Sequence, residues 1–172
     1  GAPIVELLTD FDAQYSLVGS EGPIFWFLTD LDAPMRRVIE IDIRSPERSN
    51  WKTVIPEGDG ALTSVSAVGD HFVAEYLVDA KSEVVIYDLE GEIVREVALP
   101  GIGSVSGFGG EIDDPETFFA FSGFTTPTRI YRYDVLTGER ELFREPEVDF
   151  DPEAYETRQV FYRSSDGARI PM

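Results

Sequence analysis

The sequence offers few residues that could carry out nucleophilic chemistry. His71 is the only histidine, so serine-type catalysis would need it as the base that takes a proton from a hydroxyl. It lies in VGDHFVAEY, at the predicted start of a strand beside a turn, where a surface histidine at the edge of a sheet is the simpler interpretation. The motif GSVSG at 103–107 lacks the G-x-S-x-G spacing of a nucleophile elbow. The sequence therefore predicts no catalytic residue in this chain.

Two further patterns could hold a cofactor or a metal ion. GIGSVSG at 101–107 resembles a dinucleotide-binding loop, but Ser106 stands where the third glycine is needed, and a strand is predicted there instead of a helix. Carboxylates that could bind calcium or form a catalytic pair cluster in EIDDPE and DFDPE: Glu111, Asp113, Asp114, Glu116, Asp149, Asp151 and Glu153. Neither cluster has the glycine and distal glutamate of an EF-hand loop, and both lie in predicted loops. We therefore expect no cofactor and no metal ion.

Composition argues against several classes of partner. The 172 residues include 33 acidic and 14 basic side chains and no cysteine, so the formal net charge is −19. Such a charge repels phosphates, and we expect neither nucleic acid nor an anionic membrane as a partner. No apolar run is long enough to cross a bilayer, and GAPIVELLTD lacks the pattern of a signal peptide. The lack of cysteine excludes disulfides and fits a reducing compartment.

A repeat of about 46 residues organises the chain. The segments VIEIDI, VVIYDL and IYRYDV alternate apolar and polar residues, which is typical of a strand with one packed face. Their aspartates keep the step of the repeat: Asp42, Asp88 and Asp134. The same step separates aromatic residues in a second predicted strand: Trp26, Phe72 and Phe118. Internal repetition on this scale predicts that one structural unit occurs three times.

Each repeat contains two further predicted strands. An earlier strand is YSLVGSEG, LTSVSAVGD or GSVSGFGG, and a later, more polar one is WKTVIPEG, EIVREVALPG or ERELFREP. Four short strands in this length are typical of a β-propeller blade. We therefore predict an all-β fold, a partial β-propeller of about three four-stranded antiparallel blades, at about 11–57, 58–101 and 102–147. Because propellers close with about four to eight blades, three cannot form a ring, and further blades are expected elsewhere.

Four strings in collinear order resemble the prolyl oligopeptidase family: LLTDFDAQYSLVGSEGPIFWFLTDLDAP, LPGIGSVSGFGG, SGFTTPTRIYRYDVLTGE and YETRQVFYRSSDGARIPM. The resemblance implies that residues 1–150 are the last three blades of a seven-bladed propeller, and that residues 151–172 begin an α/β-hydrolase domain. In this family the propeller covers a Ser, Asp, His triad that cleaves short peptides after proline, and it keeps folded proteins out. The triad would lie beyond Met172, so the resemblance carries no catalytic, cofactor-binding or metal-binding residue onto this chain.

The last part of the chain carries the one site that the resemblance transfers. FDPEAYETRQ at 150–159 matches the crossing between the two domains, where a hinge motion would open the lid. The predicted hinge residues are Phe150, Asp151, Pro152, Tyr155, Glu156 and Thr157. VFYRSSDGARIPM then predicts a strand, a turn at Asp166 and Gly167, and only the first residues of a returning strand. We therefore expect Met172 to be a cut within the first hairpin of the hydrolase domain.

Together these patterns predict the non-catalytic lid and substrate-size filter of a prolyl oligopeptidase, inactive on its own. Its partners would be the remaining blades and the hydrolase domain of the same protein, and short peptide substrates. The acidic charge would also suit basic peptides, so a related oligopeptidase that prefers basic residues is one alternative. A stand-alone module whose open blades pair with a second copy is another. The cytoplasm is the expected compartment of the parent protein, with the periplasm as the alternative.

Overall fold

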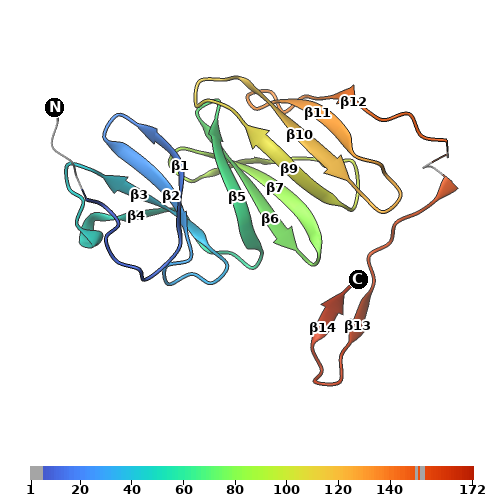
Figure 1. Ribbon diagram of the computed structural model, residues 1–172, viewed down its shortest axis with the longest axis horizontal. Coiled ribbons are helices and arrows are strands. Elements are labelled where there is room, and N and C mark those ends of the chain that lie inside the picture. The colour runs from blue at the N-terminus through green and yellow to red at the C-terminus, as the bar shows by residue number, and fades with distance from the viewer. Residues whose placement is uncertain (1–5, 150, 152–153) are drawn as a thin grey trace.

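The computed structural model describes residues 6–149, 151 and 154–172. Twelve strands of this described part form three four-stranded antiparallel sheets, here called blades 1 to 3, and Figure 1 shows them side by side. Blade 1 contains β1 (Tyr15–Glu21), β2 (Ile24–Thr29), β3 (Arg37–Asp42) and β4 (Lys52–Ile55), with the short helix η1 (Arg48–Asn50) before β4. Blade 2 contains β5 (Ala61–Val68), β6 (His71–Val78), β7 (Lys81–Asp88) and β8 (Ile93–Glu96). Blade 3 contains β9 (Ser104–Gly109), β10 (Glu116–Ser122), β11 (Arg129–Asp134) and β12 (Arg140–Arg144).

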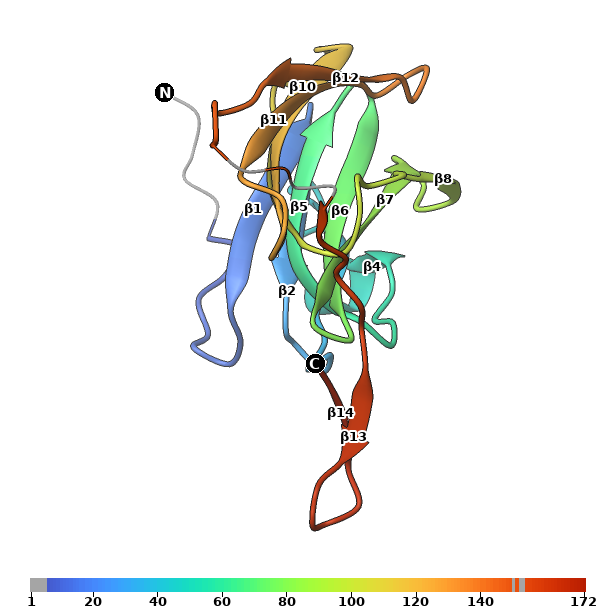
Figure 2. The same cartoon turned by 90° about the vertical axis from the view of Figure 1, so that its right-hand side faces the viewer.

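The strand order within each blade follows the chain, as expected for a propeller blade. All twelve predicted strands are present, so the predicted all-β fold of three four-stranded blades is confirmed. Figure 2, turned by 90°, shows the blades lying one behind another. The blades therefore contact each other through their faces, as two packed sheets do. The division into two domains at residue 150 stays a prediction.

The repeated aspartates close the turn after the third strand of each blade. The Asp42 carboxylate accepts the N–H of Arg44 at 2.9 Å, and the Asp134 carboxylate accepts the N–H of Thr137 at 2.7 Å. Asp88 accepts two backbone N–H groups, from Glu90 at 3.0 Å and from Glu92 at 2.8 Å. Aspartate is favoured at such turns because its short side chain can bond the backbone two residues on. The 46-residue step of these residues thus has a local structural cause.

The repeated aromatic residues, in contrast, do not occupy equivalent positions. Trp26 and Phe118 pair with the residues two positions before Asp42 and Asp134, whereas Phe72 pairs with Tyr87, directly before Asp88. The second strand of blade 2 is therefore shifted by one residue. Because side chains alternate between the faces of a sheet, a shift of one residue turns Phe72 to the opposite face.

This shift accompanies a short turn between β6 and β7. Only Asp79 and Ala80 join these strands, while blades 1 and 3 have longer loops at the same place. Both residues have positive φ, 49° and 63°, the backbone of a type I′ hairpin turn. A two-residue turn fixes the register of its strands, and here that register differs by one residue from the pairing in the neighbouring blades.

Three apolar clusters form the core. Between blades 1 and 2, Trp26 meets Phe72 edge-to-face with ring centroids 5.2 Å apart. Between blades 2 and 3, Phe108 stacks on Phe119 at 4.6 Å, and Phe119 stacks on Tyr131 at 5.2 Å. The third cluster covers the outer face of blade 1, where Leu7 and Leu8 pack on its buried Phe27, Ile39 and Ile41. The faces between the blades therefore account for most of the buried apolar surface.

A separate hairpin follows the blades, made of β13 (Phe161–Arg163) and β14 (Arg169–Pro171). The predicted turn is present, with Gly167 at φ 87°. The prediction of a barely begun returning strand is wrong. Val160 and Met172 exchange two backbone hydrogen bonds of 2.9 Å, so both arms have the same length and are paired throughout.

Candidate interdomain site

One end of the three blades forms a surface that we call the connecting face. It contains the loop at 30–36, the turn of Asp79 and Ala80, and the loop at 123–128. These lie at the same end because β2, β6 and β10 each end there. Figure 1 shows β6 pointing toward the side on which β13 and β14 lie. The hairpin therefore leaves the blades from the connecting face.

The segment between blade 3 and the hairpin touches the connecting face through two side chains. The hydroxyls of Thr157 and Thr125 lie 3.2 Å apart, and the Gln159 amide donates to the carbonyl of Asp79. The segment also carries an ion pair of its own, between Arg158 and Glu156 at 2.5 Å. Each of these two hydrogen bonds to the blades is worth about 1 kcal/mol.

The hinge stays a prediction, and two of its predicted residues have no described placement. Phe150 and Pro152 lie outside the described residues. Asp151, Tyr155, Glu156 and Thr157 lie in the described segment, and of these Thr157 has the contact with the blades given above. Sequence reasoning missed Gln159, because its partner Asp79 lies 80 residues earlier and only the folded chain brings the two together.

The connecting face exposes apolar side chains beside this segment. Phe124 is 98% exposed and Tyr155 is 64% exposed. Between blades 2 and 3 the same face has a cleft of about 280 Å³, lined by Ala80, Ile102, Gly103, Ser104, Ser122, Gly123 and Phe124. Exposed aromatic side chains beside a cleft are typical of a surface that contacts another protein or domain.

The hairpin combines a rigid turn with exposed aromatic side chains. The Asp166 carboxylate accepts hydrogen bonds from the Ser164 hydroxyl and the Ala168 N–H, and these bonds lower the pKa of Asp166. The Arg169 guanidinium lies over the Phe161 ring, 3.4 Å from its centroid. Figures 1 and 2 show the hairpin extending away from the blades. An ordered hairpin with apolar residues in solvent is suited to pairing with further protein.

The residues first considered for chemistry have structural partners. His71 Nδ1 lies 2.5 Å from the Gly69 carbonyl within a turn, and Ser104 and Ser106 belong to the strand β9. Among the acidic residues, Asp114 accepts the N–H of Glu111 at 2.9 Å, and Glu116 pairs with Arg132. Glu153 lies outside the described residues. Within the part of the chain that the structure describes, no group of three or more metal-binding side chains is arranged to hold an ion.

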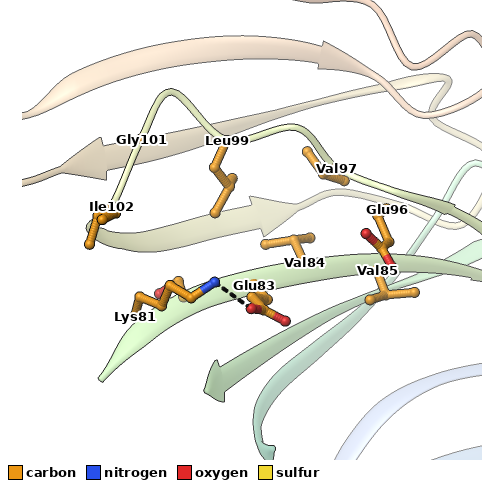
Figure 3. Close-up of a pocket in the computed structure, with 10 residues that line it drawn as sticks. Lys81, Glu83, Val84, Val85, Glu96, Val97, Leu99, Gly101 and Ile102 are labelled. Carbon is orange, nitrogen blue, oxygen red and sulfur yellow. Dashed lines mark hydrogen bonds and ion pairs between the residues drawn. The ribbon is translucent and has the colours of Figure 1, made fainter. Parts of the chain in front are cut away.

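A groove of about 300 Å³ runs along the outer part of blade 2, beside the first residues of β7 (Figure 3). It is present because β8 is short and pairs only with the later part of β7. The Lys81 ammonium points along the groove to the Glu83 carboxylate, 2.6 Å away. The rest of the wall combines Val84, Val97 and Leu99 with the polar Ser82 and Glu96. The ion pair neutralises both charges, and the groove contains no pairing of a nucleophile with a base.

Among the described residues, no helix has the length and apolar character needed to span a bilayer.

Comparison with known proteins agrees with this architecture. Residues 1–146 match the family described as prolyl oligopeptidase, N-terminal beta-propeller domain. A prolyl endopeptidase of Elizabethkingia meningoseptica is 39% identical over 168 residues, which cover 98% of this chain and 24% of the relative. A solved prolyl endopeptidase structure is 42% identical and superposes with a TM-score of 0.87 over 96% of this chain and 24% of its own. Prolyl oligopeptidase B of Galerina marginata is 31% identical, with a TM-score of 0.86 over 96% of this chain and 24% of its own. This chain thus spans about a quarter of the length of the relatives it matches.

Proposed function

The chain belongs to the prolyl oligopeptidase family, and we propose that it is the non-catalytic lid and substrate-size filter of a serine peptidase that cleaves short peptides after proline. In this proposal, residues 150–159 contain the hinge, and the connecting face lies against an α/β-hydrolase domain. The partners are then the remaining blades, the hydrolase domain of the same protein, and short peptide substrates.

The position of the crossing segment carries this proposal. Thr157 and Gln159 hold it to the blades by one side-chain hydrogen bond each, to Thr125 and Asp79. A hinge needs a segment that can move while the blades stay folded, and this segment follows β12, the last strand of blade 3. The exposed Phe124 and Tyr155 beside it provide apolar surface for a second domain.

A chimeric enzyme would test the hinge. This chain replaces the matching quarter of the Elizabethkingia meningoseptica prolyl endopeptidase, and Thr125→Cys and Thr157→Cys are introduced together. The 3.2 Å between the two hydroxyl oxygens indicates that sulfurs at these positions could form a disulfide with little adjustment. Oxidation would lock the segment to blade 3, so we expect slower cleavage of a proline-containing chromogenic peptide and recovery after reduction.

The two single cysteine variants are the matched controls, and their activity should not respond to oxidant. If the locked double variant cleaves the peptide as fast as the reduced enzyme, Thr157 is not part of a hinge. The isolated chain provides an independent test of the assignment as a lid. It should cleave no proline-containing peptide, and turnover that survives purification and is abolished by a serine-directed inhibitor would contradict the assignment.

The net charge of −19 supports the second candidate function, a lid of a related oligopeptidase that prefers basic residues. The same chimera distinguishes the two candidates when matched chromogenic peptides with proline or arginine before the cleaved bond are compared. Because the donor enzyme supplies the catalytic domain, the informative value is the change in the arginine-to-proline ratio caused by the exchanged quarter. An unchanged ratio would leave proline specificity as the function that the chain serves.

A further inference from the structure

A cleft of about 450 Å³ lies between blades 1 and 2, at the end of the blades opposite the connecting face. Its wall includes Glu21, Trp26, Glu40, Lys52, Val54 and Glu90. Lys52 is 2.7 Å from the Glu40 carboxylate, so that pair is neutralised. Neither Glu21 nor Glu90 forms an ion pair with any described residue. The cleft therefore keeps two free negative charges beside an apolar wall.

The Trp26 side chain belongs to the apolar part of this wall. It is 2% exposed, and Nε1 is buried without a hydrogen-bond partner among the described residues. The Cε3 edge of the ring lies toward β1, only 3.8 Å from where a Cβ on Gly19 would be. Because Nε1 has no accessible surface, a group that enters the cleft meets the Trp26 ring and not this donor.

The equivalent space between blades 2 and 3 shows which group fills it. Arg95 pairs with the residue two positions before Asp88, as Lys52 does with the residue two positions before Asp42. Arg95 crosses to blade 3 and donates to the Leu136 carbonyl at 2.7 Å. Leu136 and Glu90 are equivalent as well, since each lies two positions after its repeated aspartate. Between blades 1 and 2, Lys52 turns back to Glu40, and no guanidinium occupies the space.

We propose that the cleft between blades 1 and 2 binds a guanidinium group, namely the arginine side chain of a peptide. The guanidinium would take the place that Arg95 has in the next interface, donating to the Glu90 carbonyl and to the carboxylates of Glu21 and Glu90. Arginine suits such a site because its planar group donates several hydrogen bonds at once. This site is separate from the proposed hinge and does not depend on it.

Tryptophan fluorescence can report on the site alone. The chain has two tryptophans, and Trp51→Phe leaves Trp26 as the only one. The probe is Nα-acetyl-arginine amide, and Nα-acetyl-citrulline amide is the control ligand of the same shape without the charge. We expect a saturable change of emission with the arginine probe and none with the citrulline probe. In case Trp51→Phe fails to fold, the Trp26 indole resonance of the unaltered chain gives the same readout by NMR.

Two sets of variants locate the binding. Glu21→Gln with Glu90→Gln should weaken binding about fivefold or more, because two charged contacts are lost. Glu139→Gln with Glu147→Gln removes the same charge from two exposed positions elsewhere and should leave the affinity unchanged. Equal losses in both pairs would mean that the probe binds the general negative charge of the protein, and would overturn the proposal.

Lys52→Arg is the sharpest variant. It places a guanidinium where blade 2 has Arg95, so we expect it to fill the cleft from within, to raise the melting temperature and to abolish binding of the probe. Lys52→Gln removes the charge without filling the cleft and should still bind. A Lys52→Arg variant that binds the probe as tightly as the parent chain would overturn the proposal, as would the lack of a saturable response in the parent chain.

Discussion

The interface between blades 2 and 3 contains stacked rings and a cleft of about 280 Å³, whereas the interface between blades 1 and 2 combines one aromatic pair with a larger cleft. In the former, Phe119 lies between Phe108 and Tyr131, with centroid distances of 4.6 and 5.2 Å. In the latter, Trp26 contacts Phe72 edge-to-face at 5.2 Å, and a cleft of about 450 Å³ remains beside it. Both interfaces join blades of the same strand order, so backbone topology alone does not decide how well an interface is filled.

Arginine side chains that cross between blades are a second difference between the two interfaces. Arg95 of blade 2 donates to the Leu136 carbonyl of blade 3, and Arg140 of blade 3 donates to the Ala98 carbonyl after blade 2. The equivalent of Arg95 in blade 1, Lys52, forms an ion pair within its own blade. At this position of the repeat, an arginine joins two blades while a lysine stays within its own blade, beside the larger cleft.

The largest expected effect comes from the centre of the ring stack. Phe119 is 1% exposed, so Phe119→Ala should lower the free energy of unfolding by about 3–5 kcal/mol, measured by urea denaturation. Phe118→Ala is the matched control, because its side chain lies on the opposite face of β10, is 40% exposed, and contacts Phe143. We expect the control to lose about 1 kcal/mol. Similar losses in both variants would show that the stack is not the main support of this interface.

A carboxyl group on the face of blade 2 that packs against blade 3 should make the stability of the chain depend on pH. Glu75 is 7% exposed, and burial raises the pKa of its carboxyl from an ordinary value near 4.5 to about 7. The folded chain then keeps a proton that the unfolded chain loses above about pH 4.5. Stability should therefore fall as pH rises from about 4.5 to 7 and stay level above, by about 3 kcal/mol for this group.

Glu75→Gln should remove this fall, and unfolding in urea at pH 5 and pH 8 measures it. Glu96→Gln, at an exposed position of β8, is the control and should keep the pH dependence of the parent chain. A Glu75→Gln variant with the same loss of stability between the two pH values as the parent chain would mean that other carboxylates cause the dependence.

A smaller loss of stability is expected when Arg95, the arginine that crosses from blade 2 to blade 3, is replaced. Arg95→Met keeps much of the apolar stem and removes the hydrogen bond to the Leu136 carbonyl. The expected loss of unfolding free energy is about 2 kcal/mol, because hydrogen bonds of charged groups are worth more than neutral ones. Lys52→Met, at the equivalent position of blade 1, should cost less than about 1 kcal/mol, since it breaks only an exposed ion pair. Equal losses would remove the distinction between the two interfaces.

The parts of this architecture that the sequence predicts are those with local causes. The twelve strands follow from alternating apolar residues, and the turn after each third strand follows from Asp42, Asp88 and Asp134. The parts that it does not predict depend on contacts over long distances along the chain. The equivalence expected for Trp26, Phe72 and Phe118 fails because pairing register is a property of two strands, and spacing in one strand does not report it.

The same distinction applies to the candidate sites. The crossing segment is visible in the sequence as FDPEAYETRQ, but its contacts are not, since Gln159 bonds a carbonyl 80 residues earlier. The cleft beside Trp26 is still less predictable. It depends on whether one long side chain, Lys52, turns to its own blade or to the next, and nothing in the local sequence decides this direction.

The smallest predicted effect concerns the two-residue turn between β6 and β7. Ala80 has φ 63°, a left-handed backbone that costs a residue with a Cβ about 1–2 kcal/mol, and the second position of a type I′ turn favours glycine. Ala80→Gly relieves this cost but gives the unfolded chain more freedom, so we expect a net gain of about 1 kcal/mol in urea denaturation. Ala120→Gly, within β10, is the control and should lose about 0.5–1 kcal/mol.

A gain in stability at Ala80 with unchanged effects of Phe119→Ala and Arg95→Met would mean that the two-residue turn sets which face of β6 meets each neighbouring blade. A loss at Ala80 would mean that the register of blade 2 is held by the interfaces themselves, with the turn adapting to them.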